Sequence, residues 1–372
     1  MTRVWPVGTR LQDLDTPCLT VDLDALDRNI EQMARLVQPT AATLRPHSKS
    51  HKTPYIAHRQ LVAGARGVCC AKLGEAEAMV AGGIGNVLIT SPVVGQDKIG
   101  RLAALARQAN VGVVVDSPDM LSLMDESLHS FGSRLGMVIE VDVGQNRCGV
   151  RNIEDAVTLA REIAKFHHMT LEGMQGYQGV LQQVRNYDER RTLAQRALET
   201  LQRTAEAVRK AGLEIAVLTG GGSGSSQIDI DLGGLTELQA GSYVFMDTNY
   251  TQVQWNSSGG RIPFEPSLHV ISSVVSKPTR DLAVVDAGWK CLSSDAGIPV
   301  VLDSFAEEYA FGGDEHGKIR LNEDGHTIRP GDRVTIRPSH CDTTVNLYNE
   351  LIGLRNGIVE SVWEITARGR SD

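Results

Sequence analysis

Short apolar runs recur through the first two thirds of the chain, and segments with apolar residues at helical spacing separate them. Runs that are apolar throughout are typical of strands buried on both faces of a parallel sheet. They lie at about 43–48, 67–71, 86–90, 112–115, 136–141, 171–177, 215–219 and 236–240. The helical segments between them include 74–81, 98–108, 153–165 and 190–211. Strands and helices that alternate in this way predict an α/β fold, a (β/α)8 barrel of the TIM type.

The pattern changes at both ends of the chain. After about residue 260, loops rather than helices join the strand-like runs, which predicts a mostly antiparallel β domain. A strand expected at 17–22, ahead of an amphipathic helix at 24–37, is predicted to join that domain. We therefore predict a barrel domain at 22–258 and a β domain at 1–21 and 259–372. The later strands are expected at 270–276, 282–285, 333–336 and 359–365.

Composition and charge narrow the class of protein. With 41% apolar and 22% charged residues in 372, the chain can bury a large core and is not expected to be disordered. A net charge of -8 argues against a nucleic acid or an anionic membrane as a partner. No apolar run approaches bilayer length, and the N-terminal segment has no apolar leader. We expect a soluble, cytoplasmic protein with reduced cysteines, since none of the six forms a CxxC pair.

The stretch from Arg45 to Lys52 is unusually basic for the end of a strand. If it is extended, alternation places Arg45, His47, Lys49 and His51 on one face. Neighbouring positive charge and partial burial would both lower the pKa of Lys49, leaving a nucleophilic amine that can form a Schiff base. The alternative is an ordinary solvated basic segment.

Other polar residues follow the predicted barrel strands at the end where barrels carry their active sites. Arg147 follows the fifth strand and Tyr177 ends the sixth, while 219–226 and 241–243 follow the seventh and eighth. Glycine and hydroxyl residues in these two loops would let backbone N–H groups surround a phosphate. A phosphate site opposite Lys49 predicts pyridoxal phosphate as the cofactor. A plain glycine-serine turn is the alternative for 220–226, which matches neither the Walker A nor the GxGxxG pattern.

His340 and Asp342 form a second cluster, in the predicted β domain. If extended, they share a face, and an imidazole with a carboxylate can hold a divalent metal such as manganese, magnesium or zinc. A hydrogen-bonded pair in a loop is the alternative.

At these landmarks the sequence resembles a known family, the fold-type III pyridoxal phosphate enzymes. They include D-threonine aldolase, 3-hydroxy-D-aspartate aldolase and eukaryotic-type D-serine dehydratase. The resemblance runs nearly end to end and implies a barrel like the N-terminal domain of alanine racemase. Its landmarks are Asp15–Leu19, Arg45–Lys52, Glu140–Gly149, Thr219–Ser225, Glu237–Asp247, Asp314–Gly317, His340–Thr344 and Trp363–Gly369.

The resemblance implies a role for each candidate residue. Lys49, rather than Lys52, would form the Schiff base, with His47 beside it in the cofactor site. Arg147 would bond the phenolic oxygen of the cofactor, and Tyr177 would lie near the pyridine ring. The phosphate-binding segments would contain Thr219, Gly221, Gly222, Ser223, Gly241, Ser242 and Tyr243.

The metal pair bears on the reaction. In the family that this sequence resembles, the dehydratases carry His-x-Cys and the aldolases carry His-x-Asp. With His340 and Asp342 this chain sides with the aldolases, and strand alternation would turn the intervening Cys341 away.

One position departs from the family pattern. Six residues after the tyrosine that matches Tyr177, the aldolases usually carry a histidine thought to deprotonate the substrate hydroxyl, whereas this chain has Gln183. Glutamine cannot act as a general base. Either the metal activates the hydroxyl through bound water or hydroxide, or another histidine such as His51 substitutes, or the preferred reaction has changed.

The resulting hypothesis is a lyase that cleaves D-3-hydroxy-amino acids to glycine and an aldehyde. Manganese is the metal expected first. The nearest alternative is a D-serine or 3-hydroxyaspartate dehydratase that releases ammonia and a 2-keto acid. An alternative of another class is a pyridoxal phosphate carrier without catalytic activity, which would need neither the β domain nor the His-x-Asp pair. The resemblance also implies a homodimer.

Overall fold

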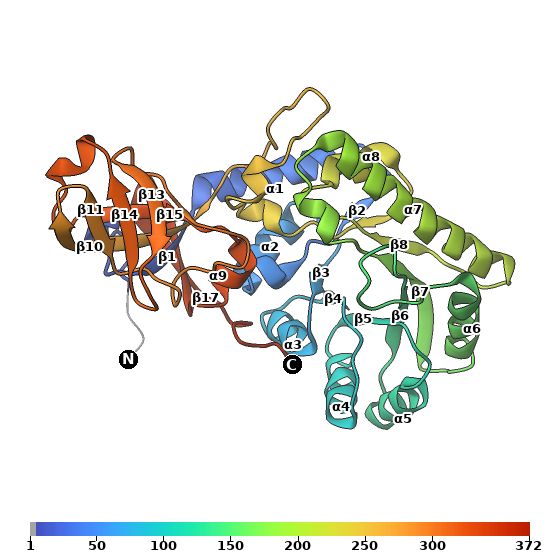
Figure 1. The fold of residues 1–372 in the computed structure, drawn as a ribbon. Helices are drawn as coiled ribbons and strands as arrows, with labels where there is room; N and C mark the ends of the chain where they lie inside the picture. Colours follow the sequence, from blue (N-terminus) through green and yellow to red (C-terminus); the bar gives the residue numbers. More distant parts are fainter. Residues whose placement is uncertain (1–4) are drawn as a thin grey trace.

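The computed structural model, which describes residues 5–372, contains a barrel and a β domain side by side (Figure 1). The barrel sheet is parallel in the order β2-β9-β8-β7-β6-β5-β4-β3. A bridge between His47 and Cys69, with the Cys69 N–H donating to the Pro46 carbonyl at 2.9 Å, joins the two ends. The predicted barrel is confirmed. Its strands are β2 (Thr43–Leu44), β3 (Val68–Cys70), β4 (Asn86–Ile89), β5 (Asn110–Val115), β6 (Leu135–Glu140), β7 (Met169–Gly176), β8 (Val217–Gly220) and β9 (Glu237–Leu238).

The barrel strands are apolar on both faces because both faces are covered. Cys69, Leu88, Val114 and Val138 point inward and fill the lumen as one cluster. The residues between them, such as Cys70, pack under the surrounding helices. Those helices are α1 (Leu23–Val37), α2 (Pro54–Val62), α3 (Leu73–Ala81), α4 (Gln96–Leu105), α5 (Leu121–Phe131), α6 (Ile153–Ile163), α7 (Tyr187–Lys210) and α8 (Ser226–Leu232).

The amphipathic helix expected at 24–37 is α1. Its N-cap Asp22 accepts a hydrogen bond from the Ala25 N–H at 3.0 Å. Its apolar stripe, which includes Leu26, Ile30 and Met33, is buried. No helix was predicted at α2, α5 or α8. These helices have 9, 11 and 7 residues, and their apolar periodicity covers only two or three turns, which is a weak signal.

The predicted β domain is also confirmed. β1 (Cys18–Asp22) lies between β10 (Leu268–Thr279) and β16 (Glu350–Arg355), antiparallel to the first and parallel to the second, so the N-terminal strand joins this domain as expected. β14 (Gly317–Leu321) alternates buried and exposed residues, the pattern of a sheet with one solvated face. The remaining strands are β11 (Leu282–Val285), β12 (Val300–Val301), β13 (Ala306–Phe311), β15 (Arg333–Arg337) and β17 (Ile358–Glu364).

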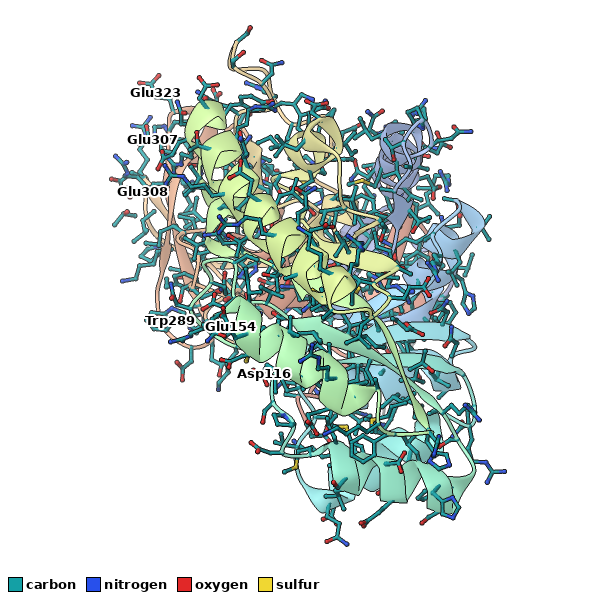
Figure 2. All side chains as sticks on the ribbon, turned by 90° about the vertical axis from the view of Figure 1, so that its right-hand side faces the viewer. Asp116, Glu154, Trp289, Glu307, Glu308 and Glu323 are labelled. Atoms are coloured by element: carbon teal, nitrogen blue, oxygen red, sulfur yellow. The ribbon has the colours of Figure 1, made fainter. Side chains whose placement is uncertain are left out.

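Charged side chains lie on the outer surfaces of both parts. Figure 2 shows Glu307, Glu308 and Glu323 projecting outward from the β domain, and Glu154 on α6. Within the described part of the chain, no helix is long and apolar enough to cross a bilayer.

Candidate functional site

The segment that carries Lys49 is a turn rather than a strand. β2 ends at Leu44, and Ser48–Ser50 forms a 3₁₀ turn capped by His47, whose Nδ1 accepts from the Lys49 N–H at 3.3 Å. The Ser48 hydroxyl also donates to the Cys69 carbonyl at 2.9 Å, which draws the chain toward β3. The prediction that this stretch stays extended was therefore wrong beyond His47.

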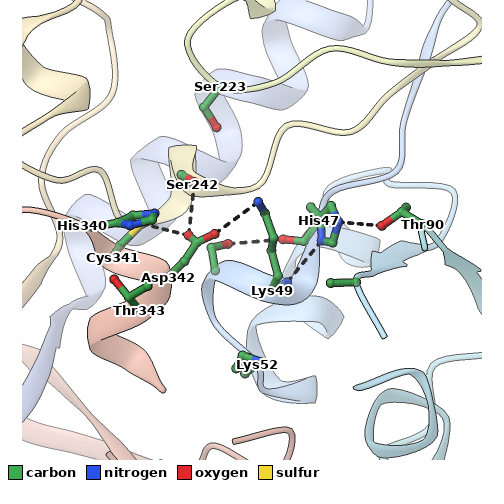
Figure 3. A network of polar contacts seen from close by, with 12 residues as sticks. His47, Lys49, Lys52, Thr90, Ser223, Ser242, His340, Cys341, Asp342 and Thr343 are labelled. Atoms are coloured by element: carbon green, nitrogen blue, oxygen red, sulfur yellow. Dashed lines mark hydrogen bonds and ion pairs between the residues drawn. The ribbon is translucent and has the colours of Figure 1, made fainter. Parts of the chain in front are cut away.

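The basic residues of this segment do not surround Lys49. Arg45 pairs with Glu237 inside the barrel at 2.9 Å, and Lys52 pairs with the buried Glu75 at 3.1 Å. Lys49 Nζ lies 3.4 Å from Asp342 Oδ2, and this carboxylate raises the pKa of Lys49 despite partial burial. The predicted lowering of that pKa was wrong in this arrangement, because the nearest charge is negative and comes from a distant segment. Figure 3 shows Lys49 between Asp342 and His47, with Lys52 directed away.

Both histidines near Lys49 are kept neutral by burial. His47 Nε2 lies 3.0 Å from Thr90 Oγ1, and Thr90 in turn donates to the Cys70 carbonyl. The His47 ring therefore donates through Nε2 and accepts through Nδ1, and burial holds its pKa well below the usual range. Burial likewise lowers the pKa of His51 to about 4, and the His51 side chain, fully inaccessible to solvent, accepts from the Thr53 N–H.

A cavity of about 70 Å³ opens at the C-terminal ends of the barrel strands. Lys49, His47, Arg147 and Tyr177, all predicted from the sequence, line it. Lys49 Nζ lies 6.0 Å from the centroid of the Tyr177 ring. Other lining residues are Ala71, Thr90, Ser91, Gln175 and Gln239. The structure thus brings the predicted Schiff-base lysine and its two predicted cofactor contacts into one cavity.

The two predicted phosphate loops are joined by a hydrogen bond. The Tyr243 N–H donates to Ser223 Oγ at 2.9 Å, linking the loop after β8 to the 3₁₀ turn Ser242–Val244. Several backbone N–H groups in these loops, including those of Ser223, Gly224 and Ser242, have no protein acceptor within the described residues. The Tyr243 side chain belongs to the core instead, where its hydroxyl accepts from Gln60.

Two positions in these loops require glycine, one for its backbone conformation and one for the close approach of another segment. Gly221 has φ +72°, in the left-handed region that glycine tolerates best. A Cβ at Gly241 would lie 2.5 Å from the His47 carbonyl oxygen. A larger side chain there would push the loop away from the segment that carries Lys49.

The segment that carries the two metal candidates becomes helical after His340 instead of continuing as a strand. His340 is extended, but Cys341–Val345 forms the short helix α9, so the predicted alternation of His340 and Asp342 about Cys341 was wrong. Cys341 Sγ lies 3.3 Å from Asp342 Oδ1. His340 Nδ1 lies 2.7 Å from Asp295 Oδ2, which leaves Nε2 as its free ligand atom. Among residues 5–372, no group of three or more histidine, cysteine or acidic side chains is arranged to hold a metal.

Comparison with known proteins gives concordant matches. Residues 21–249 match the family described as alanine racemase, N-terminal domain, and residues 267–354 match a putative serine dehydratase domain. The chain is 38% identical to the D-threonine aldolase of an Arthrobacter species, over 98% of this chain and 95% of that protein. It is 37% identical to the 3-hydroxy-D-aspartate aldolase of Paracoccus denitrificans strain Pd 1222, over 98% and 94%. The crystal structure of D-threonine aldolase from Filomicrobium marinum superposes with a TM-score of 0.95 at 42% identity, over 99% of this chain and all of that chain.

The chain belongs to the D-threonine aldolase and 3-hydroxy-D-aspartate aldolase family of fold-type III enzymes. This membership supports pyridoxal phosphate as the cofactor. The geometry fits it. The amides of Ser223, Gly224 and Ser242 are suited to a phosphate, and Lys49 stands in the adjoining cavity.

Gln183 and His51, which the sequence suggested for catalysis, lie outside the cavity. Gln183 ends the 3₁₀ turn Val180–Gln183, is exposed, and makes no side-chain hydrogen bond within the described part of the chain. His51 is buried behind the turn of Lys49. The structure therefore brings neither of them to the residues that line the cavity.

Sequence reasoning missed the polar floor of the cavity and the partner of His340. Thr90 lies two positions beyond the inward-facing Leu88, so strand alternation could have identified it. Asp295 carries no such signal, because it lies in a loop whose path depends on the tertiary fold.

Proposed function

We propose that this protein is a lyase, dependent on pyridoxal phosphate and a divalent metal, that cleaves D-3-hydroxy-amino acids to glycine and an aldehyde. The observation that carries the proposal is the meeting of Lys49 and Asp342 at 3.4 Å. Lys49 comes from the barrel and lines the cofactor cavity, whereas Asp342 comes from the β domain beside His340. The two domains therefore bring an amine and the carboxylate of the proposed metal pair to one point.

His340 Nε2 and Asp342 would hold the metal, with substrate and water completing its coordination. Such an open site suits catalysis, where a bound cation lowers the pKa of a coordinated hydroxyl. Asp295 supports this role, because a carboxylate on Nδ1 fixes the ring orientation and tautomer of a ligand histidine. Nitrogen and oxygen donors suit manganese, which we propose as the metal, as well as magnesium and zinc.

In the proposed reaction the β-hydroxyl would pass its proton to hydroxide held at the His340 and Asp342 pair, the Cα–Cβ bond breaks, and the β-carbon leaves as an aldehyde. Bound pyridoxal phosphate would supply the sink for the electron pair left at Cα. Lys49 would hold the cofactor covalently and would return a proton to Cα, which completes glycine. Asp342 and His340 would hold the metal that binds the β-oxygen, and Tyr177 and Arg147, on the cavity wall, would border the cofactor.

One observation favours a second candidate, a dehydratase that releases ammonia and a 2-keto acid. Residues 267–354, which include His340 and Asp342, match a putative serine dehydratase domain. The carboxylate at Asp342 favours the aldolase, since the resemblance associates the dehydratases with a thiolate ligand at that position.

We also propose that the enzyme is a cytoplasmic homodimer. The dimer is supported by the family resemblance. The location is supported by free thiols at Cys69, Cys70, Cys148, Cys291 and Cys341, as expected of a reducing compartment.

The identity of the products tests the proposed function. Purified protein with pyridoxal phosphate and Mn²⁺ is given D-threonine and then D-phenylserine, with and without a chelator. We expect glycine with acetaldehyde or benzaldehyde, both lost on chelation. Ammonia and a 2-keto acid would contradict the proposal and establish the dehydratase.

Two lysine variants show whether the products come from this site. Lys49→Ala is expected to abolish turnover and the cofactor absorbance that depends on its covalent link. The control is Lys72→Ala, which removes an exposed lysine outside the cavity and should retain both. Turnover that survives Lys49→Ala would exclude Lys49 as the essential amine.

A further inference from the structure

Four buried polar side chains form a floor across neighbouring strands beneath the cavity. Glu140, Gln175 and Thr219 lie at matched positions of β6, β7 and β8, and Gln239 follows β9. Their exposures are 3%, 1%, 0% and 4%. Polar groups so deeply buried are costly unless they are hydrogen-bonded, and these are bonded to one another.

The hydrogen bonds of the floor have a defined direction. Gln175 Nε2 donates to Glu140 Oε2, so Gln175 must direct its carbonyl oxygen away from Glu140. That oxygen accepts from Gln239 Nε2 at 2.7 Å, and Gln239 Nε2 also donates to Thr219 Oγ1 at 2.9 Å. Both amide protons of Gln239 are thereby used.

Glu140 is the residue that sets this direction. A glutamine alone can face either way, because its amide donates at one end and accepts at the other. A carboxylate only accepts, so the ionised form of Glu140 holds Gln175 in the observed orientation, whereas a protonated carboxyl could also donate. Burial raises the pKa of Glu140 to about 8, so the form that only accepts predominates above about pH 8.

The consequence appears at the cavity wall. Gln239 lines the cavity with Lys49 and Tyr177, and its Oε1 accepts no protein hydrogen bond within the described residues. This oxygen is also not among the fully buried unpaired atoms, so it is open to the cavity. Gln239 therefore presents an acceptor, and no donor, to whatever occupies the space.

We propose that Glu140 is a positioning residue that acts through Gln175 to fix the Gln239 carbonyl toward the cavity, so that the site selects pyridoxal phosphate with a protonated ring nitrogen. The phosphate and the phenolic oxygen of this cofactor are acceptors at neutral pH, and its protonated ring nitrogen is the ring donor that a carbonyl can bind. A protonated ring withdraws electrons more strongly, which suits a reaction that leaves an electron pair at Cα. The inference rests on the proposed cofactor but not on which bond of the substrate breaks.

Nuclear magnetic resonance of bound cofactor labelled with ¹⁵N at the ring tests this proposal, because the ring resonance moves strongly on protonation. In the wild-type holoenzyme we expect the protonated position at pH 9, where Glu140 is ionised. Glu140→Gln replaces a carboxylate, which only accepts hydrogen bonds, with an amide of nearly the same shape that can also donate. Gln239→Leu removes the carbonyl that faces the cavity. Both are expected to move the resonance toward the unprotonated position and to weaken cofactor binding measured by titration of the apoenzyme.

The matched control is Glu172→Gln, which neutralises a glutamate on the same strand as Gln175 but outside the cavity. The ring ¹⁵N resonance of cofactor bound to this variant should equal that of cofactor bound to the wild type. An unprotonated ring in the wild type, or an unchanged resonance in Glu140→Gln and Gln239→Leu, would overturn the proposal and leave Glu140 a purely structural role. The aldolase assignment can fail separately, since release of ammonia from an enzyme with a protonated ring would refute the reaction and support the positioning role.

Discussion

Lys49 takes its chemistry from its spatial contacts rather than from its sequence neighbours. Arg45 and Lys52 are neutralised by Glu237 and Glu75, and the charge that acts on Lys49 comes from Asp342, almost three hundred residues away. The sequence indicated Lys49 as the candidate reactive position. It could not supply the sign of the pKa shift, because that depends on which side chains the fold brings near.

His51 offers a pH test at the scale of one residue. Its pKa is about 4 in the folded protein, against an ordinary value of 6.5, because burial disfavours the charged ring. The stability that this neutral ring contributes is therefore complete above about pH 6.5 and is lost as the pH falls toward 4. Between pH 7 and pH 5 the wild type should lose about 2 kcal/mol more unfolding free energy than His51→Asn.

Chemical denaturation of both proteins at the two pH values provides the measurement. Comparing the two cancels the titration of other groups, such as His269, which burial also keeps neutral. Equal pH dependence in the two proteins would show that His51 titrates normally in the folded state. That result would agree with the sequence-based suggestion that His51 acts as a general base.

At the scale of elements, the predicted phosphate loop after β8 is held by a segment that the sequence did not connect with it. Gln182, in the 3₁₀ turn Val180–Gln183, donates through Nε2 to Ser225 Oγ at 2.8 Å and accepts from the Ser225 N–H at 3.1 Å. Ser225 Oγ in turn donates to Asp229 Oδ2 on α8 at 2.6 Å. The turn after β7 therefore braces the loop after β8.

Removal of this brace should weaken both the fold and the cofactor site. Gln182→Ala leaves the buried Ser225 N–H without a partner and removes one of the hydrogen bonds to Ser225 Oγ, so we expect the unfolding free energy to fall by about 2 kcal/mol. Pyridoxal phosphate should also bind less tightly in a titration of the apoenzyme. The neighbouring exposed residue gives the control, since Gln183→Ala should change neither quantity. Equal effects of the two substitutions would contradict the bracing role.

At the scale of the whole molecule, part of the barrel shares a hydrophobic core with the β domain, while the rest of the barrel has a buried cluster of its own. Leu26 and Met33 of α1 belong to the same buried cluster as Val270 of β10, Ile336 of β15 and Trp363 of β17. The Lys49 contact also needs both parts, because Asp342 reaches Lys49 from α9 of the β domain. Neither part completes the core or the site by itself.

This shared core should make unfolding cooperative. Proteins with two domains commonly unfold in separate steps. Here exposing either part would expose apolar surface of the other, so we expect a single transition in scanning calorimetry that coincides with loss of the near-ultraviolet circular dichroism signal. Two resolved transitions would show that the parts fold independently.

The sequence by itself determined the barrel, the antiparallel domain and the position of the cavity. The barrel strands are apolar on both faces, and Lys49, Arg147 and Tyr177 follow them at the same end of the sheet, so periodicity and chain order suffice. Only the tertiary structure decided the pairing of Lys49 with Asp342, the support of His340 by Asp295, and the direction of the hydrogen bonds from Glu140 to Gln239. These depend on contacts between segments far apart in the chain, and a short-range pattern carries no information about which distant side chain arrives or which way its donors point.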